Sequence, residues 1–398
     1  MKFKNVLSAV TALMLTSVLA FSGCTDQKNE SSHEESSTPQ SSKEKQESSN
    51  NTDKSETSKT ESEKENSAAE SSEEEPEYSL PAYNKITPAV WEVTDSNANV
   101  IYMMGSIHAA DADALEMPDY FETAYAKCDS LAVECDITEA QLDIFSLNGL
   151  LYTDGTTIQD HVPAADYKKA VEALSTAGSY SSNYDYMKPI MWSALGETVA
   201  IERAGLYTNY GIDTLLIKRA KNDKKTVLEV ESVDSQYSLL ANLSDEIQLL
   251  LYHQLGTDNY IDDMEKELRE TYEAWKNGTL DESLLDSDND TTEESLSDEE
   301  LKLLEQYNDA MLNNRNKGMV EKALEYMKSG KKVMFVVGAA HFYGEKGILQ
   351  LMKDSGCTIR QLTTEDAETI PAKATPAIES TEEEISVPET DPGTARAA

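Results

Sequence analysis

Two histidines stand at matching positions in two short apolar segments of this chain. Val100–His108 reads VIYMMGSIH and Val333–His341 reads VMFVVGAAH, so each segment ends in the pattern Gly-x-x-His. A run of five apolar residues rich in Val, Ile and aromatic side chains is long enough for a buried strand and short for a helix. The glycine permits a tight turn or a close backbone approach. Each histidine is therefore predicted just beyond the C-terminal end of a buried strand, where open α/β sheets place catalytic groups.

Two glutamates are predicted at the same edge of the sheet. Glu134 and Glu231 follow the next two buried strands, so they join His108 and His341 there. Imidazoles and carboxylates are ligands for a divalent metal ion with an open position. Such an ion lowers the pKa of water and creates a nucleophile near neutral pH. Without a metal, the same side chains could act as general base and general acid. The spacing leaves both chemistries open.

Each of these side chains also has a purely structural interpretation. A histidine after a strand is often a packing residue, and a glutamate there is often solvated or part of the cap of the next helix. Arg315 lies in a helical segment, where a surface charge or a salt bridge is the default. His161 and His253 lie outside any such context and are not assigned to the site.

The elements that must position these residues alternate between strands and helices. This alternation predicts an α/β fold with a central sheet. We expect the sheet to consist of two related halves, each with a strand ending in Gly-x-x-His, with a large helical insertion between them. The predicted strands are 89–94, 100–104, 131–134, 225–230, 333–337 and 358–362, and the predicted helices are 118–129, 163–177, 187–204, 211–221, 235–255, 259–275, 301–329 and 344–354.

Residues 1–24 resemble a lipoprotein signal peptide. Lys2 and Lys4 precede the apolar stretch Val6–Phe21, and two small residues precede Cys24. In such peptides the cysteine becomes the lipidated N-terminus of the mature protein. Cys24 is therefore predicted to anchor the protein to the outer face of the cell membrane, as on Gram-positive bacteria. An uncleaved membrane helix and an ordinary signal peptide are the alternatives.

Composition divides the rest of the chain into a linker, a domain and a tail. Residues 25–82 are rich in Ser and Glu and poor in large apolar residues, which predicts a disordered acidic linker. Residues 83–363 form the predicted domain, interrupted by a mobile acidic loop at 278–300, and residues 364–398 form a predicted disordered tail. The formal net charge of −40 argues against nucleic acid as a partner, because its phosphates would repel the chain. Four cysteines in 398 residues do not make a disulfide framework.

Several short motifs follow one another in the order found in one protein family. They are GSIH (105–108), VECD (133–136), KP (188–189), GID (211–213), LEVESVDSQ (228–236), NRN (314–316) and GAAHFYGEKGI (338–348). From about residue 89 to about residue 362, the chain resembles the TraB/GumN family, which belongs with the Tiki proteases and the pheromone-shutdown TraB proteins.

The resemblance implies an α/β fold with two related halves and a metal-dependent peptidase activity. It also implies relatives among hydrolases of the erythromycin-esterase kind. The correspondence covers the motif histidines His108 and His341, the acid Glu134 after the second buried strand, Glu231 and Gln236 of the family's L-E-x-x-x-x-Q element, and Arg315 in the helix before the last motif.

These residues lead to the hypothesis of an extracytoplasmic, lipid-anchored hydrolase, acting on a peptide or small extracellular substrate. His108, His341 and Glu134 would hold a manganese, cobalt or zinc ion. Glu231 would act as general base, and the two glutamates could exchange these roles.

Arg315 would pair with a substrate carboxylate or stabilise an oxyanion, and Gln236 would contact the substrate. A surface protein that sequesters a secreted peptide signal without cutting it is the alternative from another class. A metal-free hydrolase that uses His and Glu is the third possibility.

Overall fold

The computed structural model describes residues 86–138, 149–285 and 297–368. The predicted signal peptide with Cys24, the predicted linker and residues 369–398 of the predicted tail lie outside the described residues. Within the described ranges, no helix combines the length and the apolar character needed to cross a membrane.

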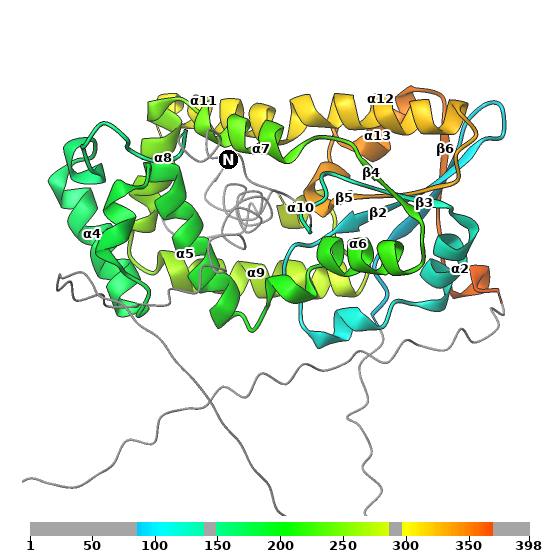
Figure 1. Cartoon of the computed structure of the whole chain (residues 1–398), viewed down its shortest axis with the longest axis horizontal. Helices are drawn as coiled ribbons and strands as arrows, with labels where there is room; N and C mark the ends of the chain where they lie inside the picture. The colour runs from blue at the N-terminus through cyan, green and yellow to red at the C-terminus, as the bar shows by residue number, and fades with distance from the viewer. Residues whose placement is uncertain (1–85, 139–148, 286–296, 369–398) are drawn as a thin grey trace, which may run out of the picture.

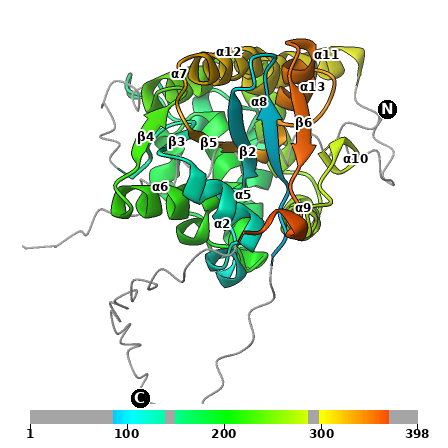
Figure 2. The same cartoon turned by 90° about the vertical axis from the view of Figure 1, so that its right-hand side faces the viewer.

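One mixed sheet organises the described part of the chain. Its six strands are β1 (Val90–Thr94), β2 (Val100–Ser106), β3 (Ser130–Val133), β4 (Thr226–Glu229), β5 (Val333–Gly338) and β6 (Thr358–Gln361). Their order across the sheet is β4-β3-β5-β2-β1-β6, with β4 and β6 at the two edges (Figure 2). The strands β4, β3, β5 and β2 run parallel, and β1 is antiparallel to both of its neighbours. The predicted α/β class is therefore confirmed.

Helices lie on both faces of the sheet and form a group beyond one end of it (Figure 1). Their bounds are α2 (Asp119–Lys127), α4 (Ala164–Thr176), α5 (Pro189–Arg203), α6 (Ile212–Asn222), α7 (Val233–Ala241), α8 (Asp245–Leu255), α9 (Tyr260–Lys276), α10 (Glu282–Leu285), α11 (Asp298–Asn308), α12 (Asn314–Lys328) and α13 (Ile348–Asp354). The helices α4, α5 and α8 form the group away from the sheet. Helices α9 and α11–α12 extend from this group to the sheet (Figure 1).

The central strand β5 is buried on both faces. Val333, Phe335 and Val337 point to one face of the sheet and pack with residues of α12 and α13. Met334 and Val336 point to the opposite face and pack with residues of α2, α6 and α9. Because successive side chains of a strand face opposite sides, an all-apolar strand requires a layer of helices on each face. The helical group has its own core, which includes Trp192 and Tyr252.

Two predicted helices differ from the observed ones in a way that capping explains. The predicted helix 235–255 is two helices, α7 and α8, because Ser244 starts the second one by accepting a hydrogen bond from the Ile247 N–H. The predicted helix 301–329 begins earlier, at Asp298, where Ser297 and Glu300 form a capping box. A π-helical turn, Asp309–Asn313, separates α11 from α12.

The acidic loop predicted at 278–300 contains ordered elements at both of its ends. Helix α10 and the start of α11 lie within this range, and residues 286–296 lie outside the described residues. The first residues of the predicted tail also contact the domain. Asp366 accepts a hydrogen bond from Arg360, and Glu368 pairs with Lys127 at 2.7 Å.

Glu197 on α5 gives a prediction about stability. Its side chain is 1% exposed, and neither carboxylate oxygen has a hydrogen-bond partner among the described residues. Burial raises the pKa of Glu197 well above its ordinary value, so the folded state keeps its proton while the unfolded state loses it above about pH 4.3. The stability from this group is therefore full at low pH and falls as the pH rises. Glu197→Gln should make the protein more stable than the wild type at about pH 8 and change it less at about pH 5.

Urea unfolding of both proteins at these two pH values measures this effect. Glu202→Gln, on the exposed side of the same helix, is the control and should stay within about 0.5 kcal/mol of the wild type at both. An effect of Glu197→Gln that does not depend on pH would contradict the prediction.

Candidate functional site

The two Gly-x-x-His segments lie side by side at the carboxyl edge of the sheet. β2 and β5 are neighbouring parallel strands, and Ser106 pairs with Gly338. The chain leaves β5 through a short 3-10 turn, Ala339–His341. This turn packs against Gly105, where a Cβ atom would come within 2.7 Å of the Ala339 Cα. The first glycine of the motif is therefore needed for the close approach of the two segments.

A buried arginine binds both predicted glutamates. Nη2 of Arg315 donates to Oε2 of Glu134 and to Oε2 of Glu231, each at 2.6 Å. Nε of Arg315 also donates to Glu231, at 2.9 and 3.1 Å. The arginine side chain is 8% exposed, so the charges meet away from bulk water. Burial alone would raise the pKa of Glu134, but Arg315 and the two site histidines lower it to about 2. Glu134 is therefore an anion at neutral pH.

Gln236 completes the contacts of the two carboxylates. Its Nε2 donates to Glu134 at 2.9 Å and to Glu231 at 3.2 Å. The Cys135 thiol donates to its Oε1 at 3.4 Å, and this fixes which end of the amide faces the carboxylates. Gln236 therefore orients Glu134 and Glu231, and its contact with a substrate stays a prediction.

The second carboxylate oxygen of Glu134 faces a small space beside Gly338. Oε1 accepts a hydrogen bond from the Gly338 N–H at 2.7 Å and lies 3.7 Å from Nε2 of His341. A Cβ atom on Gly338 would lie 3.0 Å from Glu134 Oε1, 3.5 Å from His341 Cδ2 and 4.0 Å from His108 Nε2. The structure therefore brings both motif histidines and Glu134 around one point.

His341 is fully buried and neutral. Its Nδ1 lies 2.6 Å from Oδ1 of Asn316, and its Nε2 has no hydrogen-bond partner in the described part of the chain. Burial and the nearby charge of Arg315 lower the pKa of His341 to about 3. The unprotonated ring therefore carries a nitrogen without a partner beside the carboxylate of Glu134.

His108 is held by a carboxylate. Its Nδ1 lies 2.6 Å from Oδ2 of Asp213, and the Ser106 hydroxyl donates to Oδ1 of the same group at 2.7 Å. Burial lowers the pKa of His108, but the charge and hydrogen bond of Asp213 together with the charge of Glu134 raise the pKa above its ordinary value. Gly211 allows the contact, because a Cβ atom there would lie 2.2 Å from the His108 carbonyl oxygen. The Ile212 N–H donates a hydrogen bond to the carbonyl oxygen of Ile107, the residue before His108.

Helix α9 holds the loop that carries His108 in place through two hydrogen bonds. Trp275 Nε1 donates to the Gly105 carbonyl at 2.8 Å, and the Tyr272 hydroxyl donates to Asp111 at 2.7 Å. Both contacts lie within a few residues of His108, one on each side. The position of this histidine is therefore set by the sheet, by α6 and by α9.

Sequence reasoning did not assign roles to Asp213 and Asn316. Both lie in short motifs, GID and NRN, whose presence was the only available signal. Each contact joins residues far apart in the chain, 105 positions for Asp213 with His108 and 25 for Asn316 with His341. Spacing could not reveal these pairs, because they depend on how α6 and α12 pack against the sheet.

Three donor atoms have the chemistry to hold a small cation. They are Nε2 of His108, Nε2 of His341 and Oε1 of Glu134, and each imidazole has an oxygen acceptor beside its other nitrogen, as metal-binding histidines do. The partnerless Nε2 and the space that a Cβ on Gly338 would fill both fit a bound ion. As the side chains stand, no group of three or more His, Cys, Asp or Glu residues in the described ranges forms a complete metal site.

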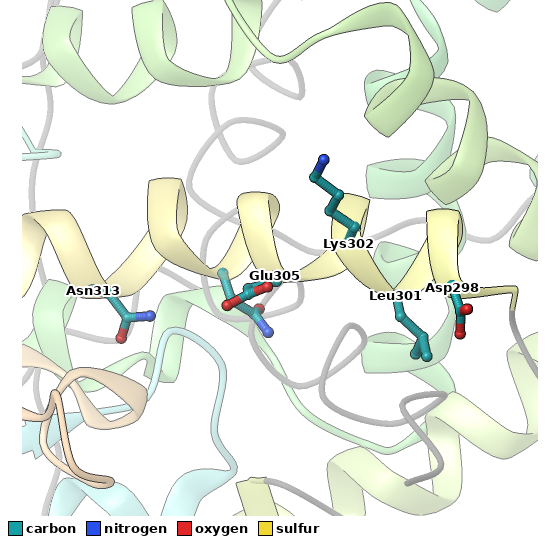
Figure 3. A pocket seen from close by; sticks show the side chains of 6 residues that line it. Asp298, Leu301, Lys302, Glu305 and Asn313 are labelled. Carbon is teal, nitrogen blue, oxygen red and sulfur yellow. The ribbon is translucent and has the colours of Figure 1, made fainter.

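A cavity of about 540 Å³ lies along α11 (Figure 3). Asn313, at its end, lies two positions before Arg315 in the chain. Lys302 extends from the opposite side of the helix from Leu301 and Asn313 (Figure 3). The cavity therefore borders α11 and the π-helical turn before α12, and its lining includes neither motif histidine. Its lining residues are Asp298, Leu301, Lys302, Glu305, Asn308 and Asn313.

The fold and the site define a mixed α/β protein with a buried His, Glu and Arg cluster at the carboxyl edge of its sheet. The family model of the TraB/PrgY/gumN family matches residues 89–361, and the chain belongs to this family. This confirms the resemblance inferred from the motifs.

Among curated relatives is the uncharacterized protein YbaP of Escherichia coli (strain K12). It is 23% identical over 267 residues, which cover 67% of this chain and 92% of the relative. The uncharacterized protein YbaP of Shigella flexneri is 23% identical over 253 residues, which cover 63% of this chain and 87% of the relative. No solved structure matches the chain.

The buried ion pairs of Arg315 predict a large loss of stability when the arginine is removed. Arg315→Met leaves Glu134 and Glu231 without their cation, so the free energy of unfolding should fall by about 3–5 kcal/mol. Chemical unfolding at neutral pH measures the loss. Arg360→Met is the control, because Arg360 pairs with Glu92 and Asp366 at the surface and should contribute about 0–1 kcal/mol. Equal losses for the two variants would contradict a buried, charged cluster.

Proposed function

We propose that this protein is an extracytoplasmic, lipid-anchored hydrolase that uses a divalent metal ion to cleave peptide bonds. One observation carries the hydrolytic site: Nε2 of His341 is buried without a partner, 3.7 Å from Oε1 of Glu134. An unprotonated imidazole nitrogen and a carboxylate oxygen are both acceptors, so they cannot hydrogen-bond to each other. A cation, or a molecule that donates two hydrogen bonds, would satisfy both.

In this proposal, His108 and His341 would hold the ion through Nε2, and Glu134 would hold it through Oε1. Two imidazoles and a carboxylate suit manganese, cobalt or zinc. A bound ion would act as a Lewis acid that lowers the pKa of water at the site. Glu134 brings a negative charge that offsets the charge of the ion, and the backbone N–H of Gly338 keeps this carboxylate in place.

Arg315 keeps Glu134 ionised and oriented. Glu231 pairs with the same arginine, and Gln236 donates a hydrogen bond to Glu134. The roles predicted for Glu231 as general base and for Arg315 as a ligand of a substrate or oxyanion stay predictions. Each role requires a substrate to replace one of the observed contacts between Arg315 and the two glutamates.

The substrate class and the location extend the proposal beyond the site. The choice of peptide bonds rests on the resemblance to the Tiki proteases. The signal-peptide pattern before Cys24 supports a lipid anchor on the outer face of the membrane and therefore a peptide or small extracellular substrate. The neighbouring positions of β2 and β5 support an origin of the sheet in two related halves.

Metal analysis of the purified full-length protein tests the proposal. The wild type should bind manganese, cobalt or zinc and should cleave members of a peptide library, with products identified by mass. His108→Ala and His341→Ala should each lower the affinity for the ion by at least about tenfold. Gly338→Ala should do the same, because its methyl group would lie 3.0 Å from Oε1 of Glu134 and 4.0 Å from Nε2 of His108.

Gly318→Ala is the matched control, since a Cβ atom at this position on α12 would contact nothing within 4 Å. Cleavage that survives complete chelation would favour the metal-free hydrolase. Peptide that is retained intact would favour a sequestering protein. A wild-type protein that binds none of the three ions contradicts the metal-dependent proposal.

A further inference from the structure

The hydrogen bond between His341 and Asn316 determines which ring nitrogen carries the proton. Nδ2 of Asn316 donates to the Lys346 carbonyl oxygen at 3.0 Å, so its Oδ1 is the atom that faces the histidine. Oδ1 can only accept a hydrogen bond, and Nδ1 of His341 lies 2.6 Å from it. Nδ1 is therefore the protonated nitrogen of the neutral ring, and Nε2 keeps a lone pair.

The contact between His108 and Asp213 has the same consequence at the other histidine. Oδ1 of Asp213 accepts a hydrogen bond from Ser106, and Oδ2 lies 2.6 Å from Nδ1 of His108. An ionised carboxylate only accepts hydrogen bonds, so Nδ1 of His108 must donate. Asp213 is 5% exposed and lies in the first turn of α6, where the helix dipole favours a negative charge.

Asn316 lies in the first turn of α12, shortly after a π-helical turn. The π-helical turn spans Asp309–Asn313, and the consecutive residues Arg315 and Asn316 after it both direct their side chains at the cluster. The Arg315 Nη1 donates back to the Met311 carbonyl oxygen inside the turn at 2.9 Å. Such turns interrupt helices frequently at functional sites.

We propose that Asp213 and Asn316 are positioning residues that fix the tautomers of the two motif histidines and leave a lone pair on Nε2 of each ring, on His108 near Gly338 and on His341 beside Oε1 of Glu134. This inference rests on the proposed function for the purpose of the lone pairs, but the tautomers themselves do not depend on it. The two partners differ in charge. The carboxylate of Asp213 makes Nε2 of His108 the stronger ligand for a cation, whereas the amide of Asn316 adds no charge beside His341.

Imidazole nitrogen NMR of the metal-free full-length protein tests the tautomers directly. At an alkaline pH, where both rings are neutral, the wild type should carry its proton on Nδ1 in His108 and in His341. Asn316→Ala should give a mixture of tautomers at His341 only, and Asp213→Ala should do so at His108 only. Asn316→Asp keeps an acceptor oxygen for Nδ1 and should retain the wild-type tautomer of His341. In Asp213→Asn, Oδ1 still accepts from Ser106 and the amide Nδ2 faces Nδ1 of His108, so the proton of His108 should move to Nε2.

Cobalt titration of the same proteins gives the second readout. Asn316→Ala, Asp213→Ala and Asp213→Asn should weaken cobalt binding by about 10–100-fold, and Asn316→Asp should recover most of the loss seen in Asn316→Ala. Asn313→Ala, in the π-helical turn just before α12, is the control and should change neither readout, because Asn313 donates its hydrogen bond to Asp309.

A wild-type His341 that is protonated on Nε2 would overturn the inference, and this result needs no variant to fold. Unchanged tautomers and unchanged cobalt affinity in Asn316→Ala would also overturn it. If the wild type shows the expected tautomers but binds no cobalt, the positioning roles stand and the metal-dependent function fails.

Discussion

The buried charge of Arg315 is the interaction on which the rest of the site depends. Its guanidinium group joins Glu134, which follows β3, to Glu231, which follows β4, and so ties α12 to two strand ends. Removing three charges from water is costly, and the cost is offset only when each charge has close partners. The position of Glu134 is therefore not adjustable, and its Oε1 is directed at Gly338 and the two histidines.

Glycines allow the backbone to approach the side chains of this cluster. Gly338 leaves room for the carboxylate of Glu134, Gly211 lets the start of α6 lie against the His108 carbonyl, and Gly105 lets the turn after β5 pack on β2. The Gly-x-x-His pattern therefore has two physical functions. Its glycine brings two strand ends together, and its histidine then lies at the edge where the partners from α6 and α12 can reach it.

The sequence was sufficient to predict the features that depend on local pattern. Apolar runs predicted β2, β3 and β5, and the rule that functional groups follow strands of an α/β sheet predicted that His108, Glu134, Glu231 and His341 would lie at one edge. The partners Asp213 and Asn316 were not predicted, because their contacts depend on the rotation of a helix about its axis. The π-helical turn before α12 changes that rotation, and no residue pattern identified it. The break between α7 and α8 was missed because the apolar period continues through Ser244.

The central claim is that two imidazoles and one carboxylate surround a single ion. X-ray absorption spectroscopy of the cobalt-loaded full-length protein tests it most directly, because it identifies the atoms bound to the metal. We predict scattering from two imidazole rings together with oxygen ligands, and the loss of one ring in His108→Ala and in His341→Ala. Cobalt surrounded by oxygen alone, or a spectrum that neither variant changes, would contradict the account.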